Sequence, residues 1–180
     1  MHKPIVVNLF GPPGCGKSTG AAYIFAMLKM HGVNCELVTE FAKDKTWEHN
    51  TTALSDQAYV FGKQCYRMSR CAEQVDVIVT DSPLLLNVIY NHNPVLGDSF
   101  NTTVLNVFNS YNNLNYMLHR VKQYNPIGRN QTEEESDKIG IEIENMLVKN
   151  SINFEKSSGD VSSYEGVVSD VLSALAQNKT

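Results

Sequence analysis

The chain has 180 residues, enough for one domain with a full core and a ligand cleft, and we expect a single domain over residues 1–180. With 15 Lys and Arg against 19 Asp and Glu it is mildly acidic, so bulk charge alone cannot hold a polyanion such as nucleic acid. The first apolar run, residues 5–10, is too short for a membrane span or a secretory leader, so we expect a cytoplasmic location. The four cysteines form no CxxC pair or zinc pattern, and we expect them to be reduced thiols.

Hydrophobic patterning predicts strands that alternate with helices along the chain. Short apolar runs indicate buried strands, and apolar residues at three- and four-residue steps indicate helices. In chain order we predict a strand at 5–10, a helix from 18 to a stop at 32, a strand at 35–39, a helix at 53–70, a strand at 75–80, helices at 84–91 and 100–111, a strand at 114–121, a helix at 133–150, a strand at 153–155 and a helix at 161–177. This alternation predicts an α/β fold, a five-stranded parallel sheet with helices on both faces.

A glycine-rich loop follows the first strand. The stretch GPPGCGKST fits the pattern G-x-x-x-x-G-K-[ST] between a strand and a helix, where backbone N–H groups and the helix N-terminus face a phosphate. Lys17 is expected to reach the β- and γ-phosphates of ATP, and Ser18 to offer its hydroxyl to Mg²⁺. The predicted nucleotide-binding residues are Gly11, Pro12, Pro13, Gly14, Cys15, Gly16, Lys17, Ser18 and Thr19. We therefore expect a P-loop NTPase of three layers.

The loop alone does not decide the reaction, because P-loop folds serve kinases, GTPases, switches and motors. The chain has no Asn-Lys-x-Asp stretch for reading guanine. A motor ATPase usually places a glutamate after the carboxylate that ends its third strand, but here Ser82 follows Asp81. This difference favours a kinase over a switch or motor.

Two carboxylates follow strands that end at the ligand side of a parallel sheet. Glu40 comes directly after the second strand, and Asp81 after the third. Glu40 would accept the proton of an acceptor hydroxyl while Asp81 holds the magnesium side with Ser18, although the reverse assignment is open. Asp81 would also suit an N-cap before Ser82 and Pro83.

Two of the four arginines, Arg120 and Arg129, bracket the polar loop after the fourth strand. We predict that residues 121–132 form a lid that brings both guanidinium groups over the ATP phosphates. The alternative is a solvated charged loop. Thr132 and the acidic residues after it predict the capped start of the next helix.

Acceptor binding is predicted at the helix over residues 53–70. Gln57, Gln64 and Arg67 are spaced to share one helix face, which would point toward the cleft or simply form a polar surface. Phe41 and Trp47 would stack on a planar acceptor, unless they pack in the core.

Together these stretches resemble a known group. The stretches are GPPGCGKST, ELVTEFAKDKTWE, DQAYVFGKQCYR, VDVIVTDSPLLL and a late GR. They resemble the P-loop kinases and ATPases common in bacteriophages, a group similar to the ribosylnicotinamide kinase domain of the bacterial regulator of NAD biosynthesis.

The resemblance implies a nucleoside-kinase-like fold and Mg²⁺-dependent transfer of the ATP γ-phosphate to an acceptor hydroxyl. Glu40 matches the group's acidic residue after the second strand, and Asp81 the one after the third. Phage members include kinases of 5-hydroxymethyl-deoxyuridine in DNA, so the implied acceptors are that base in DNA, a free nucleoside or nucleotide, or ribosylnicotinamide. A phage-encoded enzyme of this kind would act in the host cytoplasm.

Overall fold

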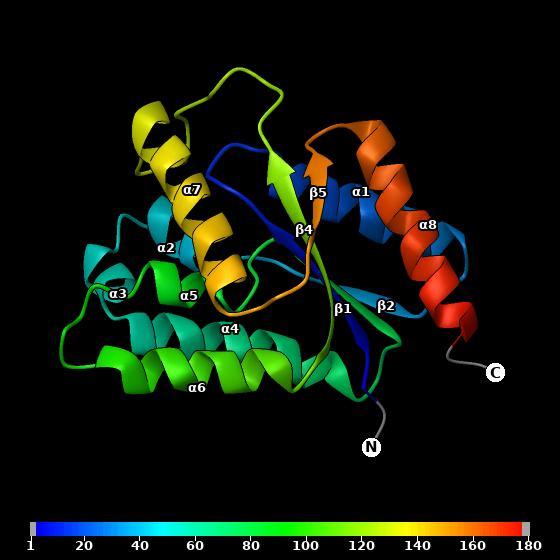
Figure 1. The fold of residues 1–180 in the computed structure, drawn as a ribbon, viewed down its shortest axis with the longest axis horizontal. Coiled ribbons are helices and arrows are strands. Elements are labelled where there is room, and N and C mark those ends of the chain that lie inside the picture. The colour runs from blue at the N-terminus through cyan, green and yellow to red at the C-terminus, as the bar shows by residue number, and fades with distance from the viewer. Residues whose placement is uncertain (1–2, 178–180) are drawn as a thin grey trace.

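A computed structural model describes residues 3–177 and contains a five-stranded, all-parallel sheet between two helical layers (Figure 1). The strands are β1 (Ile5–Phe10), β2 (Cys35–Val38), β3 (Val77–Thr80), β4 (Asn112–His119) and β5 (Glu155–Ser158), in the spatial order β2-β3-β1-β4-β5. The predicted α/β fold class is confirmed. Residues 1, 2 and 178–180, which the predicted single domain includes, lie outside the described residues.

β1 is the central strand of the sheet, so all six of its residues are buried and its apolar side chains pack on both faces. On one face, α1 (Lys17–Met30) and α8 (Val161–Gln177) pack on Ile5, Val7 and Leu9. On the other face, Val6 and Phe10 belong to a second core. The helices of that core are α4 (Gln57–Ala72), α5 (Leu86–Ile89), α6 (Gly97–Asn109) and α7 (Glu133–Lys149).

Two short helices, α2 (Phe41–Trp47) and α3 (Thr51–Ser55), connect β2 to α4. Neither was predicted as a separate element, and the single helix predicted over residues 53–70 is wrong in its continuity. Asp56 interrupts it, with a backbone outside the helical region and a side chain that caps α4 by accepting a hydrogen bond from Tyr59 N at 3.0 Å. Across residues 3–177, no helix combines the length and apolar character needed to cross a membrane.

The fourth strand starts earlier than the predicted bounds of 114–121, because it pairs with β1 from Ile5 opposite Asn112. Asparagine is a poor strand former, but the buried Asn8 of β1 donates to the side chains of Asn113 at 2.9 Å and Asn115 at 3.0 Å. Tertiary pairing therefore overrides the local preference. The fifth strand lies at Glu155–Ser158 instead of 153–155, since its polar residues pair with the end of β4.

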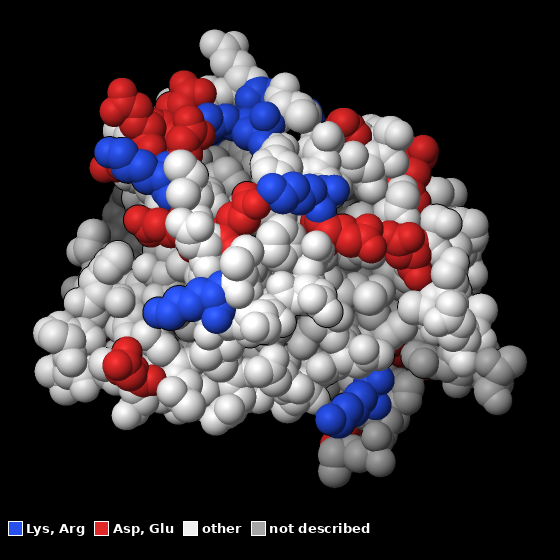
Figure 2. All heavy atoms as spheres, viewed as in Figure 1, with Lys and Arg blue, Asp and Glu red and all other residues white. Residues whose placement is uncertain are grey.

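Helix α7 begins with the cap that the sequence predicted. Thr132 Oγ1 accepts from Glu135 N at 3.2 Å, and the Glu135 carboxylate accepts from Thr132 N at 2.7 Å. Figure 2 shows acidic side chains gathered beside basic ones at the end of the molecule where α7 begins. The cap fixes the point at which the chain leaves the predicted lid and re-enters the fold.

Candidate active site

The phosphate loop lies between β1 and α1, as predicted. Gly11, Gly14 and Gly16 have φ values of +142°, +82° and +104°, a region that residues with a Cβ rarely adopt. At Gly16 a Cβ would lie only 2.6 Å from the hydroxyl of Tyr164 on α8, and that hydroxyl donates to Gly16 O at 3.1 Å. The loop's curvature thus depends on glycine and on support from α8.

The side chain of Lys17 turns back into this loop. Its Nζ donates to Gly11 O at 2.7 Å and to Pro12 O at 3.0 Å. The ammonium group is therefore held inside the curve of backbone where a phosphate chain would bind.

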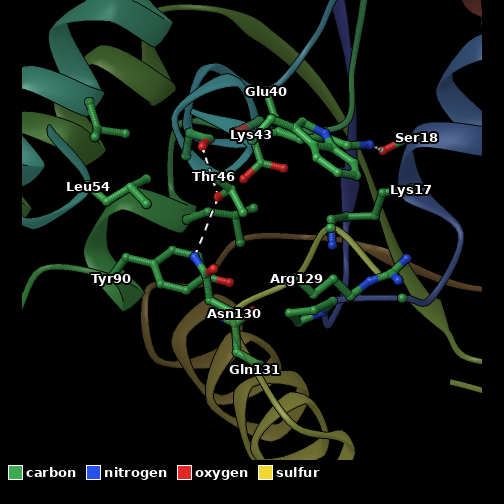
Figure 3. A pocket seen from close by; sticks show the side chains of 18 of the residues that line it. Lys17, Ser18, Glu40, Lys43, Thr46, Leu54, Tyr90, Arg129, Asn130 and Gln131 are labelled. Carbon is green, nitrogen blue, oxygen red and sulfur yellow. Dashed lines mark hydrogen bonds between the residues drawn. The ribbon is translucent and has the colours of Figure 1, made fainter. Parts of the chain in front are cut away.

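A cavity of about 570 Å³ opens beside the loop. Its walls come from the phosphate loop, α2, the α3–α4 junction, the segment from Ser82 to His92, and residues 127–131 of the predicted lid. Figure 3 shows Lys17 and Ser18 on one side of the cavity, and Leu54 and Tyr90 on the opposite side. The cavity thus has a phosphate end and a distal end.

Glu40 lies in the wall of this cavity, and Asp81 lies directly behind it. Glu40 N donates to Asp81 Oδ1 at 3.0 Å, and Asp81 is only 4% exposed. Burial raises the pKa of the Glu40 carboxyl; the positive charge of Lys17 opposes this shift, and the negative charge of Asp81 adds to it. A partly desolvated carboxyl with a raised pKa is suited to accept a proton near neutral pH.

The donor set beside the loop fits Mg²⁺ shared with a nucleotide. Ser18 offers a hydroxyl in the cavity wall, whereas the buried Asp81 does not line the cavity and lies behind Glu40; both groups are hard oxygen ligands. Among residues 3–177 no cluster of three or more His, Cys, Asp or Glu residues would hold a metal ion by itself. One or two protein oxygens completed by phosphate oxygens and water is the usual arrangement for Mg²⁺.

The two predicted lid arginines occupy different places. Arg129 lines the cavity, and its guanidinium donates to the backbone carbonyls of Asn125 and Ile127. Arg120 does not line the cavity; its side chain, 12% exposed, pairs with Asp137 and with Glu133 at 3.2 Å. The structure therefore presents one of the two predicted cations to the cavity.

The predicted acceptor-binding residues are also divided. Gln57, Gln64 and Trp47 line the cavity, but both ends of the Gln64 amide are used within the fold: it accepts from Phe41 N at 3.0 Å and donates to Thr39 O at 3.3 Å. Phe41 and Arg67 instead line a separate hollow of about 450 Å³, where Arg67 pairs with Asp44. Of the three residues predicted to share a helix face, Gln57 and Gln64 therefore line the cavity and Arg67 lines the separate hollow.

Several cavity residues were missed by sequence reasoning. These are Lys43, Thr46, Asn87, Tyr90, His92, Asn130 and Gln131. Lys43 Nζ lies 3.4 Å from Ser18 Oγ and faces the phosphate end. A helix starting after Glu40 would have revealed it, because a residue three positions later shares the same face. Asn87 and Tyr90 lie in an Asn-rich stretch that matched no motif.

Comparisons with known proteins agree with the fold. The structure of the NadR protein in complex with NR is similar with a TM-score of 0.72 and 14% sequence identity, over 95% of this chain and 51% of that chain. The NadR protein in complex with NAD and AMP-PNP gives 0.71 and 15%, over 95% and 49%. The chain thus spans about half the length of these NadR chains, and at such identity the likeness concerns the fold.

No curated protein matches the sequence. A family model described as an AAA domain matches residues 6–163, a range that includes the phosphate loop, all of the sheet except the first residue of β1, and both carboxylates of the site. This match covers most of the chain, and it shows that the protein belongs to the AAA domain family, with a P-loop nucleotide-binding fold.

Proposed function

We propose that this protein is a kinase that transfers the γ-phosphoryl group of ATP, bound with Mg²⁺, to a hydroxyl of a nucleoside-type acceptor. The observation that carries the proposal is that Glu40, Lys17 and Ser18 face one cavity. A proton acceptor and a phosphate-binding group thus share the space in which an acceptor hydroxyl would meet ATP.

In the proposed reaction, the acceptor O–H gives its proton to the Glu40 carboxylate while the oxygen forms a bond to the γ-phosphorus. The bond from that phosphorus to the β,γ-bridging oxygen breaks, and ADP leaves. Lys17 stabilises the negative charge of the β- and γ-phosphates. Mg²⁺, held by Ser18 and Asp81, would neutralise further charge on the phosphate oxygens.

The lid completes the proposed site. Arg129 and Arg120 are its proposed cations, and of the two Arg129 lines the cavity. We propose that residues 121–132 act as a lid of one kinase domain, and their contacts with α2 support this role: Asn130 Nδ2 lies 3.5 Å from Thr46 Oγ1, and Gly128 packs on the ring of Trp47. A closed lid would exclude water, which otherwise competes as acceptor.

The most specific form of the proposal has 5-hydroxymethyl-deoxyuridine in phage DNA as the acceptor, based on the sequence resemblance to phage kinases. A free nucleoside, a nucleotide or ribosylnicotinamide is the alternative. Two observations favour this alternative over an acceptor in DNA. NadR was solved with NR, and the face shown in Figure 2 carries separated basic side chains instead of a continuous basic surface.

A switch or motor that hydrolyses ATP for a partner is the candidate of another class. Asp81 is followed by Ser82, so the site lacks the usual glutamate that polarises water at this position. This class predicts partner-stimulated hydrolysis with no phosphorylated acceptor.

Incubation with γ-labelled ATP and a panel of acceptors tests the proposal. The panel contains DNA with and without 5-hydroxymethyluracil, the free nucleosides, nucleotides and ribosylnicotinamide, with Lys17→Ala as the inactive control. Label in the modified DNA alone supports the specific form, and label in free compounds alone rejects it. Release of phosphate without any labelled acceptor would refute the kinase.

A further inference from the structure

Two buried side-chain amides lie at the distal end of the cavity. Gln57 is the first residue of α4 and follows α3, which contains Leu54, and Asn87 precedes Tyr90 by three residues. Both amides line the cavity, although Gln57 is only 6% exposed and Asn87 only 4%. Figure 3 places Leu54 and Tyr90 across the cavity from Lys17. Each amide lies three residues from one of these labelled residues, and on that basis we assign both amides to the end away from the phosphates.

A backbone carbonyl determines how both amides are oriented. Asn87 Nδ2 donates to Leu84 O at 2.9 Å, and because a carbonyl only accepts, the nitrogen of Asn87 must face it. Asn87 Oδ1 consequently faces Gln57 and accepts from Gln57 Nε2 at 2.6 Å. The free end of this chain of hydrogen bonds is Gln57 Oε1, an acceptor.

Gln57 Oε1 has no hydrogen-bond partner among residues 3–177. Within the same residues, no side-chain nitrogen or oxygen is both sealed from solvent and unpaired, so this oxygen opens onto the cavity that Gln57 lines. A nearly buried acceptor in a fixed direction favours a ligand that brings a donor, since a ligand without one leaves the oxygen desolvated and unpaired.

The cavity onto which Gln57 Oε1 opens has apolar and aromatic side chains in its wall beside the polar ones already named. Leu54, Val60 and Leu86 line the cavity with the ring of Tyr90, and Trp47 lines it beneath the lid residue Gly128. Apolar and aromatic surfaces beside an acceptor in a fixed direction suit a flat heteroaromatic ring with an N–H donor on the ring or on an attached amide.

We propose that the distal end of the cavity binds the planar ring of the acceptor, and that Gln57 Oε1 accepts a hydrogen bond from a ring or amide N–H of that acceptor. The inference rests on the proposed function for the identity of the ligand as an acceptor. It narrows the substrate class to nucleosides that present an N–H donor on the ring or on an amide attached to it, and it assigns Asn87 as the residue that positions the Gln57 amide.

The first measurement needs no variant. Calorimetry in the presence of AMP-PNP compares 5-hydroxymethyl-deoxyuridine with its N3-methyl derivative, and ribosylnicotinamide with its N,N-dimethyl carboxamide. Loss of the donor should weaken binding about 10- to 100-fold in at least one pair, because the Gln57 oxygen is left unpaired. A ratio near one in both pairs, or no binding of either parent compound, overturns the inference.

The second measurement repeats this ratio in variants. In Gln57→Ala the methylated and unmethylated compounds should bind within about threefold of each other, while Gln74→Ala, an exposed glutamine at the end of α4, should keep the wild-type ratio. A wild-type ratio retained in Gln57→Ala contradicts the assignment. If that variant unfolds, the wild-type comparison still decides the question.

The outcomes separate this inference from the proposed function. Selective binding of the N–H compounds without phosphorylation would support the ring-binding site and reject the proposed kinase activity. Phosphorylation of an acceptor together with equal binding of the methylated and unmethylated compounds would support the kinase activity and reject the ring-binding site. The two results are independent because binding measured in the presence of AMP-PNP requires no phosphoryl transfer.

Discussion

The two ends of the cavity are built in different ways. The phosphate end is built on the loop at residues 11–19, of which Pro13, Gly14 and residues 16–19 line the cavity, with Lys43 and Arg129 beside them. The distal end collects side chains from α2, α3, α4, α5 and the lid, which lie far apart in sequence. Phosphate is the same ligand in every P-loop protein, whereas the acceptor differs, so a fixed local motif serves the first end and a variable assembly the second.

The largest effect is expected from Lys17→Ala at the phosphate end. Phosphoryl transfer should fall about 10³-fold or more, and the dissociation constant of ATP should rise about 10- to 100-fold, because the β- and γ-phosphates lose their cation. Lys29→Ala, on the same helix but outside the cavity, is the matched control. Calorimetry and a labelled-ATP assay measure both quantities, and unchanged ATP binding would contradict the proposed role of Lys17.

Glu40 lies between the two ends, so its loss should affect transfer without affecting nucleotide binding. Glu40→Gln should lower transfer about 10²- to 10⁴-fold, the usual contribution of a general base, and change the ATP dissociation constant less than about twofold. The exposed Glu73→Gln is the control. Unchanged transfer would reject Glu40 as the base.

The pH dependence gives a second test of Glu40. The carboxyl must be ionised to accept a proton, so kcat/KM should rise with pH through its pKa, and burial places that rise above the ordinary range of a glutamate. A raised native pKa also means that ionisation opposes folding. Glu40→Gln should therefore melt higher than wild type at pH 8, with the difference shrinking as the pH falls.

Substitution of the two lid arginines should have different effects, one on phosphoryl transfer and the other on stability. Arg129→Ala should lower transfer about 10²-fold, because Arg129 faces the cavity. Arg120→Ala should lower the melting temperature by about 2–4 °C through loss of its pairs with Glu133 and Asp137, with a smaller effect on transfer. A larger loss of transfer in Arg120→Ala would indicate that the lid rearranges around ATP.

The smallest effect is expected from Gly128→Ala, where the lid meets the distal end. Gly128 has φ +72°, and a Cβ would lie 2.7 Å from Trp47 Cζ2, so either the lid or the exposed Trp47 ring must move and their contact changes. The KM for the acceptor should rise about 5- to 10-fold while ATP binding stays unchanged. Gly62→Ala, with open space around it on α4, should leave both constants unchanged. If Gly128→Ala weakened ATP binding as much as it raised the KM for the acceptor, the proposed division of the cavity into two ends would be wrong.

Much of the fold was predictable because its signals are local. The buried strands at β1 and β3, the glycine-rich loop, and the Thr132 cap each depend on residues adjacent in sequence. The division of the predicted helix at Asp56 was not predicted, since an aspartate is as compatible with a helix surface as with a cap. The start of β4 depends on Asn8, more than a hundred residues away.

The sequence by itself determined a parallel α/β fold, the phosphate loop and the two strand-end acids, because strand periodicity and the loop motif act over a few neighbouring residues. Only the tertiary structure decided that Arg129 rather than Arg120 faces the cavity, that the Gln64 amide is used within the fold, and that Gln57 presents a free oxygen. The physical reason is that the hydrogen-bond partners of a long polar side chain are its neighbours in the folded structure, which the local sequence does not specify. Its role depends on which donors and acceptors the folded chain brings within reach.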